Sequence, residues 1–194
     1  MIRKFLGRYD TGWGIKSRGR GGGEPPGYDD NIKNIGDLLN LVEGKGNHMG
    51  KITIKKLEIG TSAYWAAFNL RNEILRKPRG QDLYHDNLPY EALSSHTAAL
   101  KDDKVIGAAC WYEDRGNGLV KHLVLEDAAR GKGVGTLLLK YAEDEMVSRG
   151  IRKCVLKARI SVTGFYEKLG YHTVGDVMPD DVPHIMMEKC LDVV

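Results

Sequence analysis

The sequence predicts a mixed α/β fold, in which helices flank a mostly antiparallel central sheet, and three observations predict it. From residue 50 onward, short apolar or alternating stretches typical of strands alternate with stretches of helical periodicity. Tight turns at 101–104 and 114–118 join consecutive strands in the first half of this region, as in antiparallel pairs. In the second half, a strong helical stretch over 135–148 separates two strands, which is the arrangement of a parallel crossover.

Local signals place the individual elements. Alternation of isoleucine with polar residues over 51–57 predicts a half-buried strand. A helix is expected from Thr61 or Ser62, either of which can cap it, to about Lys77, just before a proline. The other expected elements are a short helical piece over 91–95, strands over 97–100, 105–113 and 119–126, the helix over 135–148, a strand over 154–158, a helix over 162–169, and strands over 171–174 and 184–189.

Composition and charge exclude several classes of protein. With 194 residues, of which 42% are hydrophobic, the chain is expected to form one domain with an additional arm. A net charge of +3 is too small for a dedicated nucleic-acid binder. No apolar run approaches the roughly 18 residues of a membrane-spanning helix, and the opening residues lack the apolar centre of a secretory signal. We therefore expect a cytoplasmic protein whose partners are neither membranes nor nucleic acids.

The three cysteines, Cys110, Cys154 and Cys190, are far apart and lack the C-x-x-C spacing of metal and redox sites. Their odd number also argues against a disulfide framework. We expect reduced, mostly buried thiols of an intracellular protein and no metal site.

Composition changes near residue 50. The first fifty residues contain 12 of the 24 glycines, several of them interleaved with arginine, and too little apolar surface to order the backbone. Residues 1–49 are therefore expected to be a flexible arm, or else a mis-assigned start, since Met49 begins a segment that looks complete by itself. Residues 50–194 are expected to be the folded domain.

The most informative stretch runs from Leu123 to Thr136, where a strand ends, a glycine-rich turn follows and a helix begins at once. Backbone N–H groups at a helix start lack intrahelical partners, and the helix dipole adds partial positive charge there. Glycines allow the backbone to close around an anion, and Arg130 and Lys132 contribute charge. The turn therefore predicts a phosphate-binding site. The spacings of a Walker A loop and of a dinucleotide fingerprint are both absent.

Two motifs in the right order carry a resemblance to a known family. Arg130-x-x-Gly133-x-Gly135 resembles the Q/R-x-x-G-x-G/A motif of the GNAT acetyltransferase superfamily. One helix and one strand downstream, the segment FYEKLGY at 165–171 is close to the family's F-Y-E-K-L-G-F. The run VPHI at 182–185, together with Arg71 and His96, is similar to the branch that includes YjcF- and ElaA-type proteins. The resemblance covers about residues 50–190 and implies the GNAT fold.

The resemblance implies a role for each part of the two motifs. In this family the loop binds the pyrophosphate of acetyl-coenzyme A, and the strand before it pairs with the pantetheine arm. The Leu125 N–H would polarise the thioester carbonyl, and Tyr166 would protonate the departing coenzyme A thiolate. Where many members have a proline, this chain has Asp127. Acetyl-coenzyme A is thus the implied co-substrate, without a metal, and its implied binding residues are Leu123, Val124, Leu125, Arg130, Gly131, Lys132, Gly133, Val134, Gly135 and Thr136.

The reaction also needs a general base, because the attacking amine is protonated at neutral pH. His122 is the first candidate, since it lies on the strand before the loop and could face the acceptor site. Glu113, His96 and His184 are further candidates. Glu126 is expected to be a strand-end carboxylate rather than the base. For each histidine, a hydrogen-bonded structural role is the competing interpretation.

The predicted function is that of an N-acetyltransferase, which moves an acetyl group from acetyl-coenzyme A directly to a primary amine of a small molecule or protein. Direct transfer is expected because no cysteine occupies a nucleophile position beside a base. The alternative is a non-catalytic GNAT-fold module that binds acyl-coenzyme A as a sensor or partner, and a third, weaker hypothesis is an RNA-associated protein that uses the arm. The acceptor stays open among polyamines, antibiotics, amino acids and protein lysines, and a homodimer is one assembly that the chain could form.

Overall fold

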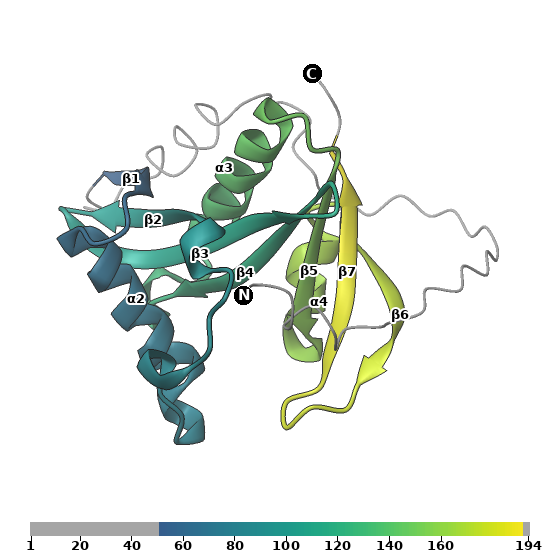
Figure 1. Cartoon of the computed structure of the whole chain (residues 1–194), viewed down its shortest axis with the longest axis horizontal. Helices are drawn as coiled ribbons and strands as arrows, with labels where there is room; N and C mark the ends of the chain where they lie inside the picture. Colours follow the sequence, from purple (N-terminus) through teal and green to yellow (C-terminus); the bar gives the residue numbers. More distant parts are fainter. Residues whose placement is uncertain (1–50, 192–194) are drawn as a thin grey trace, which may run out of the picture. The chain divides into compact units, whose positions relative to one another are not determined.

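The structure, a computed structural model, describes residues 51–191, which form a seven-stranded sheet with helices on both of its faces (Figure 1). This confirms the predicted α/β class and its mostly antiparallel sheet. The expected arm, residues 1–49, lies outside the described residues. Within 51–191, no helix is long and apolar enough to cross a membrane.

The expected elements are present, with ends that differ by a few residues from the predicted ones. Thr61 caps the first described helix, because its hydroxyl accepts a hydrogen bond from the Tyr64 N–H at 3.3 Å. The helices and strands are β1 (Ile52–Leu57), α2 (Ser62–Leu75), β2 (Ser95–Lys101), β3 (Lys104–Asp114), β4 (Asn117–Leu125), α3 (Val134–Ser148), β5 (Lys153–Arg159), α4 (Thr163–Glu167), β6 (His172–Met178) and β7 (His184–Cys190). Short 3₁₀ turns lie between them: η1 (Lys77–Arg79), η2 (Leu83–His85), η3 (Glu91–Leu93), η4 (Asp127–Ala129) and η5 (Ile160–Val162).

The strands lie in the order β1-β2-β3-β4-β5-β7-β6. All neighbours are antiparallel except β4 and β5, which run parallel and are connected by α3. A parallel pair requires a crossover long enough to return the chain to the same end of the sheet, and α3 provides it. The two turns at 101–104 and 114–118 do connect antiparallel neighbours, as predicted.

Successive residues of the central strands face opposite helices. Ala98 of β2 packs with Tyr64 and Phe68 of α2, whereas its neighbour Ala99 packs with Leu137 of α3. This alternation is the period of two that strands impose on their side chains. It therefore places α2 on one face of the sheet and α3 on the other.

The central parallel pair is short. β4 and β5 are paired only from Gly118↔Cys154 to Val120↔Leu156, although both strands continue beyond these residues. In Figure 1 the two strands converge at one end and spread apart at the other. The sheet is thus continuous at one end of these strands and divided at the other.

A β-bulge in β4 accompanies this division. Cys110 is opposite Lys121 and Ala108 is opposite Val124, so two β4 residues between these pairs face a single β3 residue. One of the two, His122, has a φ of 52°, a left-handed conformation that is uncommon for residues other than glycine. Because a bulge bends and twists its strand locally, it turns β4 away from β5.

Glu145 of α3 connects this helix to β1, β2 and β3 through hydrogen bonds. Its carboxylate accepts hydrogen bonds from Lys56 at 2.6 Å, Ser95 at 2.5 Å, the Trp111 indole at 3.0 Å and Arg149 at 2.5 Å. Burial acts against the charged form, but these donors outweigh it and lower the pKa of Glu145 to about 2. The carboxylate is therefore ionised at neutral pH.

Replacing Glu145→Gln should lower the free energy of unfolding near neutral pH by about 1–2 kcal/mol, because charge-assisted hydrogen bonds are lost. Since the folded-state pKa lies below the ordinary value of 4.5, this stabilisation is complete above about pH 5 and disappears as the pH falls toward 2. The difference between wild type and variant should therefore narrow in acid. Urea unfolding followed by tryptophan fluorescence, at neutral pH and at about pH 3, measures it.

Asp144→Asn is the matched control on the same helix. Asp144 pairs with Lys140 at 2.5 Å on a surface where both side chains are substantially exposed. Such pairs contribute less than about 1 kcal/mol. A Glu145→Gln variant that behaves like this control would contradict the assignment of Glu145 as the residue that ties α3 to the sheet.

Candidate active site

A groove of about 1230 Å³ opens where β4 and β5 part. The residues Val120–Leu125 of β4 form one wall and Leu156–Arg159 of β5 form the other. The turn at the start of α3, the helix α4, the hairpin between β6 and β7, and the end of α2 complete it. The groove thus exists because the sheet is divided at this place.

Most of the residues expected to act in function meet in this groove. Both predicted catalytic residues, His122 and Tyr166, line it. So do nine of the ten expected cofactor-binding residues: Leu123, Val124, Leu125, Arg130, Gly131, Gly133, Val134, Gly135 and Thr136. Lys132 is the exception, because it lines a smaller neighbouring pocket together with Lys101 and Lys104.

The glycine-rich turn at the start of α3 has the conformation of an anion-binding loop. Gly131 and Gly133 have φ values of 69° and 76°, which residues with a side chain adopt only at a cost in strain. The first backbone hydrogen bond of α3 runs from the Leu137 N–H to the Gly133 carbonyl at 3.0 Å. The N–H groups of the three residues between them, 134–136, consequently have no partner within the helix. Together with the helix dipole they can bind a negatively charged group.

The start of α3 packs directly on α4. A Cβ atom at Gly135 would lie 3.2 Å from the ring of Phe165, which is closer than side chains normally approach. A residue without a side chain at position 135 therefore allows the turn and the short helix to meet. This contact brings α4, whose next residue is Tyr166, close to the glycine-rich turn.

Arg130 stands at the rim of the loop and is largely exposed. Its guanidinium pairs with Asp127 at 3.0 Å, the residue that replaces the proline of many GNAT sequences. The departure from the family pattern thus adds a surface ion pair to the entry of the loop, and Arg130 remains accessible to a ligand.

The backbone of β4 presents unpaired donors to the groove. The Glu126 N–H donates to the Ile106 carbonyl at 2.9 Å and therefore points toward β3. N–H groups of successive strand residues point to opposite edges, so the Leu125 N–H points away from β3, toward the gap left by β5. A thioester carbonyl placed along this edge would find a donor there.

Tyr166 lies at the base of the groove with its ring almost fully buried. The ring packs edge-on against Phe165 and Tyr171, at centroid distances of 4.9 Å and 5.8 Å. Within residues 51–191 its hydroxyl has no hydrogen-bond partner, so the donor is available to a ligand. Burial raises the pKa of Tyr166 to about 12, and the phenol keeps its proton at neutral pH.

His122 projects into the groove from the bulge of β4. Its Nε2 lies 3.3 Å from the Tyr90 hydroxyl, whereas its buried Nδ1 has no hydrogen-bond partner among the described residues. Burial, followed by the nearby guanidinium groups of Arg71 and Arg76, lowers the pKa of His122 to about 3. The ring is therefore neutral at physiological pH and is a weak base.

Comparison of the sequence with known families decides the identity of this arrangement. The family described as Acetyltransferase (GNAT) family matches residues 64–171, which is more than half of the chain. The chain belongs to the GNAT acetyltransferase family. The match runs from α2 to the end of the second motif, so it includes the glycine-rich turn, Tyr166 and the stretches of β4 and β5 that wall the groove.

Individual relatives agree with this assignment. The uncharacterized N-acetyltransferase YitI of Bacillus subtilis is 25% identical over 146 residues, which are 70% of this chain and 97% of YitI. The crystal structure of Escherichia coli ElaA superimposes with a TM-score of 0.57 at 20% identity, covering 71% of this chain and 99% of ElaA. An aminoglycoside 6'-N-acetyltransferase complexed with coenzyme A superimposes with a TM-score of 0.62 at 22% identity, covering 73% and 98%. These structures confirm the predicted GNAT fold.

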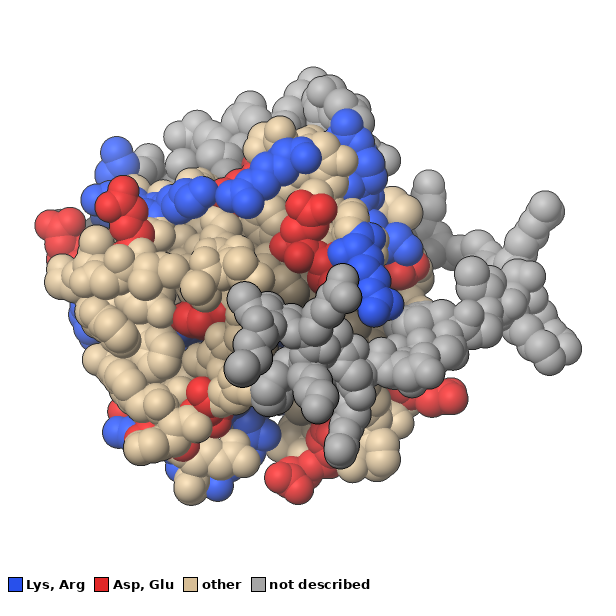
Figure 2. Space-filling model, viewed as in Figure 1, with Lys and Arg blue, Asp and Glu red and all other residues tan. Residues whose placement is uncertain are grey.

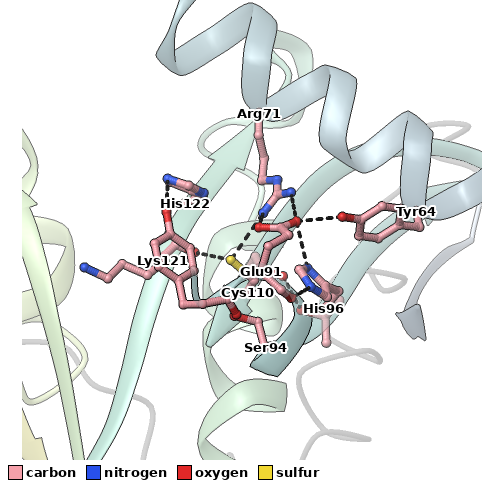
Figure 3. A network of polar contacts seen from close by, with 11 residues as sticks. Tyr64, Arg71, Glu91, Ser94, His96, Cys110, Lys121 and His122 are labelled. Atoms are coloured by element: carbon pink, nitrogen blue, oxygen red, sulfur yellow. Dashed lines mark hydrogen bonds and ion pairs between the residues drawn. The ribbon is translucent and has the colours of Figure 1, made fainter. Parts of the chain in front are cut away.

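On the side of the groove away from the loop, this GNAT protein has a buried polar network (Figure 3). Arg71 of α2, which is 2% exposed, forms an ion pair with Glu91 of η3. The Tyr64 hydroxyl donates to Glu91 at 2.8 Å, and the His96 ring meets the Glu91 carbonyl oxygen at 2.9 Å. Burial opposes the charged carboxylate, but its contacts with Arg71 outweigh burial and lower the pKa of Glu91.

The network fixes the position of Tyr90, the residue before η3. The Tyr90 ring stacks on Tyr112 of β3 with an interplanar angle of 9°, and its hydroxyl reaches His122. Burial raises the pKa of the Tyr90 phenol, so it stays protonated and can donate to the histidine. The ion pair between Arg71 and Glu91 thereby holds one wall of the GNAT groove in place.

The same network contains the one group of possible metal ligands within 51–191: Glu91, His96 and Cys110. An Arg71 nitrogen lies 3.3 Å from the Cys110 sulfur, and the same guanidinium pairs with Glu91. A buried arginine cation thus already occupies the place between these ligands. Burial also raises the pKa of the Cys110 thiol to about 11, which keeps it protonated.

The other base candidates lie in different surroundings. Glu113 is exposed on β3 and does not line the groove, and His96 belongs to the buried network. Glu126 at the end of β4 pairs with Lys104 at 2.9 Å. His184 does line the groove, where its Nδ1 lies 3.3 Å from Asp180, and burial lowers its pKa.

Sequence reasoning did not single out Tyr90 or Glu91. Both lie in an irregular segment between α2 and β2, where no periodicity marks a functional side chain. The only signal was Arg71, a charged residue on the apolar stripe of a predicted helix, which requires a buried partner. Such a residue predicts an ion pair, but it does not indicate which residue is the partner.

We predict that Glu91→Gln lowers the free energy of unfolding by about 3 kcal/mol or more, because it leaves the buried Arg71 without a counter-charge. The control is Glu73→Gln on the same helix as Arg71. Glu73 pairs with Lys77 where both side chains are more than half exposed, so the change should be within about 0.5 kcal/mol. Equal effects of the two substitutions in chemical denaturation would contradict the structural role of the Arg71–Glu91 pair.

Proposed function

We propose that this GNAT protein is an acetyl-coenzyme A-dependent enzyme that transfers the acetyl group directly to a primary amine. The observation that carries the proposal is the groove between β4 and β5, with an anion-binding loop beside it and the unpartnered hydroxyl of Tyr166 inside it. The binding of coenzyme A by the aminoglycoside 6'-N-acetyltransferase of the same fold supports it.

In this proposal, acetyl-coenzyme A binds along β4. The pyrophosphate contacts the backbone N–H groups of residues 131–136 and the accessible guanidinium of Arg130. The pantetheine arm pairs with the open edge of β4, next to Leu123 and Val124. The Leu125 N–H then donates to the thioester carbonyl and stabilises the negative charge that develops on it during attack.

Direct transfer is supported by the position of the cysteines. Cys110 and Cys154 are buried outside the groove, and burial raises the pKa of their thiols to about 11 and about 12. Cys190 is exposed at the end of β7 and does not line the groove either. None of the three is placed as a thiolate nucleophile, so a covalent acetyl-enzyme has no candidate among them.

The amine attacks the thioester carbon, and the carbon–sulfur bond breaks to release coenzyme A as a thiolate. We assign Tyr166 as the proton donor to that thiolate, because its phenol is protonated and unpartnered. We place the amine beside His122, whose Nε2 contacts the Tyr90 hydroxyl and whose Nδ1 is buried. With a pKa of about 3 the His122 ring does not retain the proton of the amine, which passes to water.

The low pKa of His122 favours one alternative function. A GNAT domain without an effective base binds acyl-coenzyme A but turns it over slowly or not at all, as a sensor or partner module would. Both functions require the same loop, so binding alone does not separate them. Release of coenzyme A thiol in the presence of a panel of amines does.

Acetyl-coenzyme A should stabilise the protein. At about 100 times its dissociation constant a ligand adds about 2.7 kcal/mol, which corresponds to a rise in melting temperature of about 5 °C or more. Gly133→Glu should remove the rise, since a side chain and a negative charge enter the anion site. Gly175→Glu is the control, because Gly175 has a similar φ of 73° but lies outside the groove. Absence of a thermal shift at millimolar acetyl-coenzyme A would refute the binding site.

Tyr166→Phe should reduce kcat by about ten-fold or more, because the ring and its packing remain while the proton donor is lost. Coenzyme affinity and melting temperature should stay close to those of the wild type. Tyr141→Phe on α3, outside the groove, is the control and should change neither. A Tyr166→Phe variant with wild-type kcat would assign Tyr166 to packing and the acid role to water.

A further inference from the structure

Lys121 is a basic residue of the groove that has no ion-pair partner among the described residues. It lies on β4 directly before the bulge, and within 51–191 no carboxylate is at ion-pair distance from its ammonium group. Across the groove, Lys157 of β5 is paired with Asp180 at 2.5 Å, so this aspartate is already engaged. Burial is the main cause that lowers the pKa of Lys121, and Lys157 adds to it, whereas Cys110 and Asp114 act in the opposite direction.

The position of the Lys121 ammonium group is nevertheless well defined. It lies over the Tyr90 ring, 5.8 Å from the ring centre, and the face of an aromatic ring attracts a cation. Tyr90 is itself held by stacking on Tyr112 and by the network around Arg71 (Figure 3). A cation kept in a fixed place, partly buried and without a counter-ion, is costly unless a ligand supplies the opposite charge.

The phosphates of coenzyme A are too far away to be this counter-charge. Lys121 precedes Leu125, the last residue of β4, by four positions. At about 3.3 Å per residue this is about 13 Å along the strand, and the anion-binding loop lies beyond it. A lysine side chain does not extend over that distance.

The charges that line the groove favour an anionic acceptor over a strongly cationic one. Arginine and lysine contribute six of the groove-lining residues and aspartate contributes two. The basic residues are Arg76, Arg79, Lys121, Arg130, Lys157 and Arg159, and the acidic residues are Asp180 and Asp181. Three of the basic residues are in ion pairs, which leaves Arg79, Lys121 and Arg159 as the basic residues of the groove without an ion pair to any described residue. Figure 2 shows acidic and basic side chains interspersed over the face of the molecule that Figure 1 shows. A polyamine or an aminoglycoside would meet this excess of positive charge, whereas an anionic group is attracted by it.

We propose that the acceptor is a small amine that also carries a carboxylate, and that this carboxylate pairs with Lys121 while the amine lies beside His122. The inference rests on the proposed acetyl transfer and narrows its substrate class to amino acids and other short amino-carboxylates. Because His122 follows Lys121 directly and both side chains face the groove, one small molecule can reach both. Lys121 is then a specificity-determining residue that contacts the acceptor.

The test compares each amino acid with its carboxamide, in which the negative charge is removed and the amine is kept. Release of coenzyme A from acetyl-coenzyme A gives kcat/KM for both members of a pair. The wild type should prefer the best carboxylate over its amide by ten-fold or more. In Lys121→Met this preference should fall to about two-fold or less, with most of the change in KM, and Lys121→Arg should restore at least half of it on a logarithmic scale.

Lys140→Met is the matched control, since Lys140 lies on α3 outside the groove and pairs with Asp144. It should keep the wild-type preference. Retention of the acetyl-coenzyme A thermal shift by each variant establishes that the fold and the coenzyme site are intact.

The outcomes separate the two proposals. Turnover of amides or polyamines at rates equal to or above those of the amino acids would overturn the carboxylate inference and leave the acetyltransferase intact. Loss of activity toward both members of a pair in Lys121→Arg as well as Lys121→Met would also overturn it, because a charge-pairing role tolerates arginine. Coenzyme binding without turnover of any amine by the wild type would overturn the proposed transferase itself.

Discussion

The separation of β4 from β5 is the constraint on which the rest of the site depends. In a parallel pair that continues to both strand ends, the backbone N–H and C=O groups are hydrogen-bonded along the whole length of the strands. Here the pairing stops at Val120↔Leu156. The bulge at His122 bends β4 out of register, at the cost of a left-handed residue. The separation produces the groove, leaves the Leu125 N–H facing it, and lets the start of α3 and the helix α4 meet at its side.

The two regions of the groove use different kinds of chemistry. In the proposed function, the loop region binds through backbone N–H groups and through glycine conformations, so it depends little on the identity of side chains. The acceptor region is built from the side chains of Tyr90, Lys121 and His122, and the buried pair of Arg71 and Glu91 holds the first of them in place. Acceptor selectivity can therefore change through a few side chains while coenzyme binding is retained.

The elements of the fold could be predicted because their signals are local. Consecutive residues specify the tight turns at 101–104 and 114–118, and they also specify the glycine-rich turn at the start of α3. The structure has each turn where the sequence predicted it. The early end of the β4–β5 pairing could not be predicted in this way. It depends on which residue of β3 faces which residue of β4, and a shift of one residue in that register has no signature in composition or periodicity.

The sequence by itself determined the strand and helix order, the glycine-rich turn before α3 and the motif that carries Tyr166, because backbone conformation and helix ends follow from residues close together in the chain. Only the tertiary structure decided what surrounds the acceptor. It places Lys132 outside the groove, it buries His122 so that its pKa is about 3, and it leaves Lys121 without an ion-pair partner among the described residues. The physical reason is that desolvation and the approach of distant charges depend on contacts between α2, η3, β4 and β5, which no single segment of the chain contains.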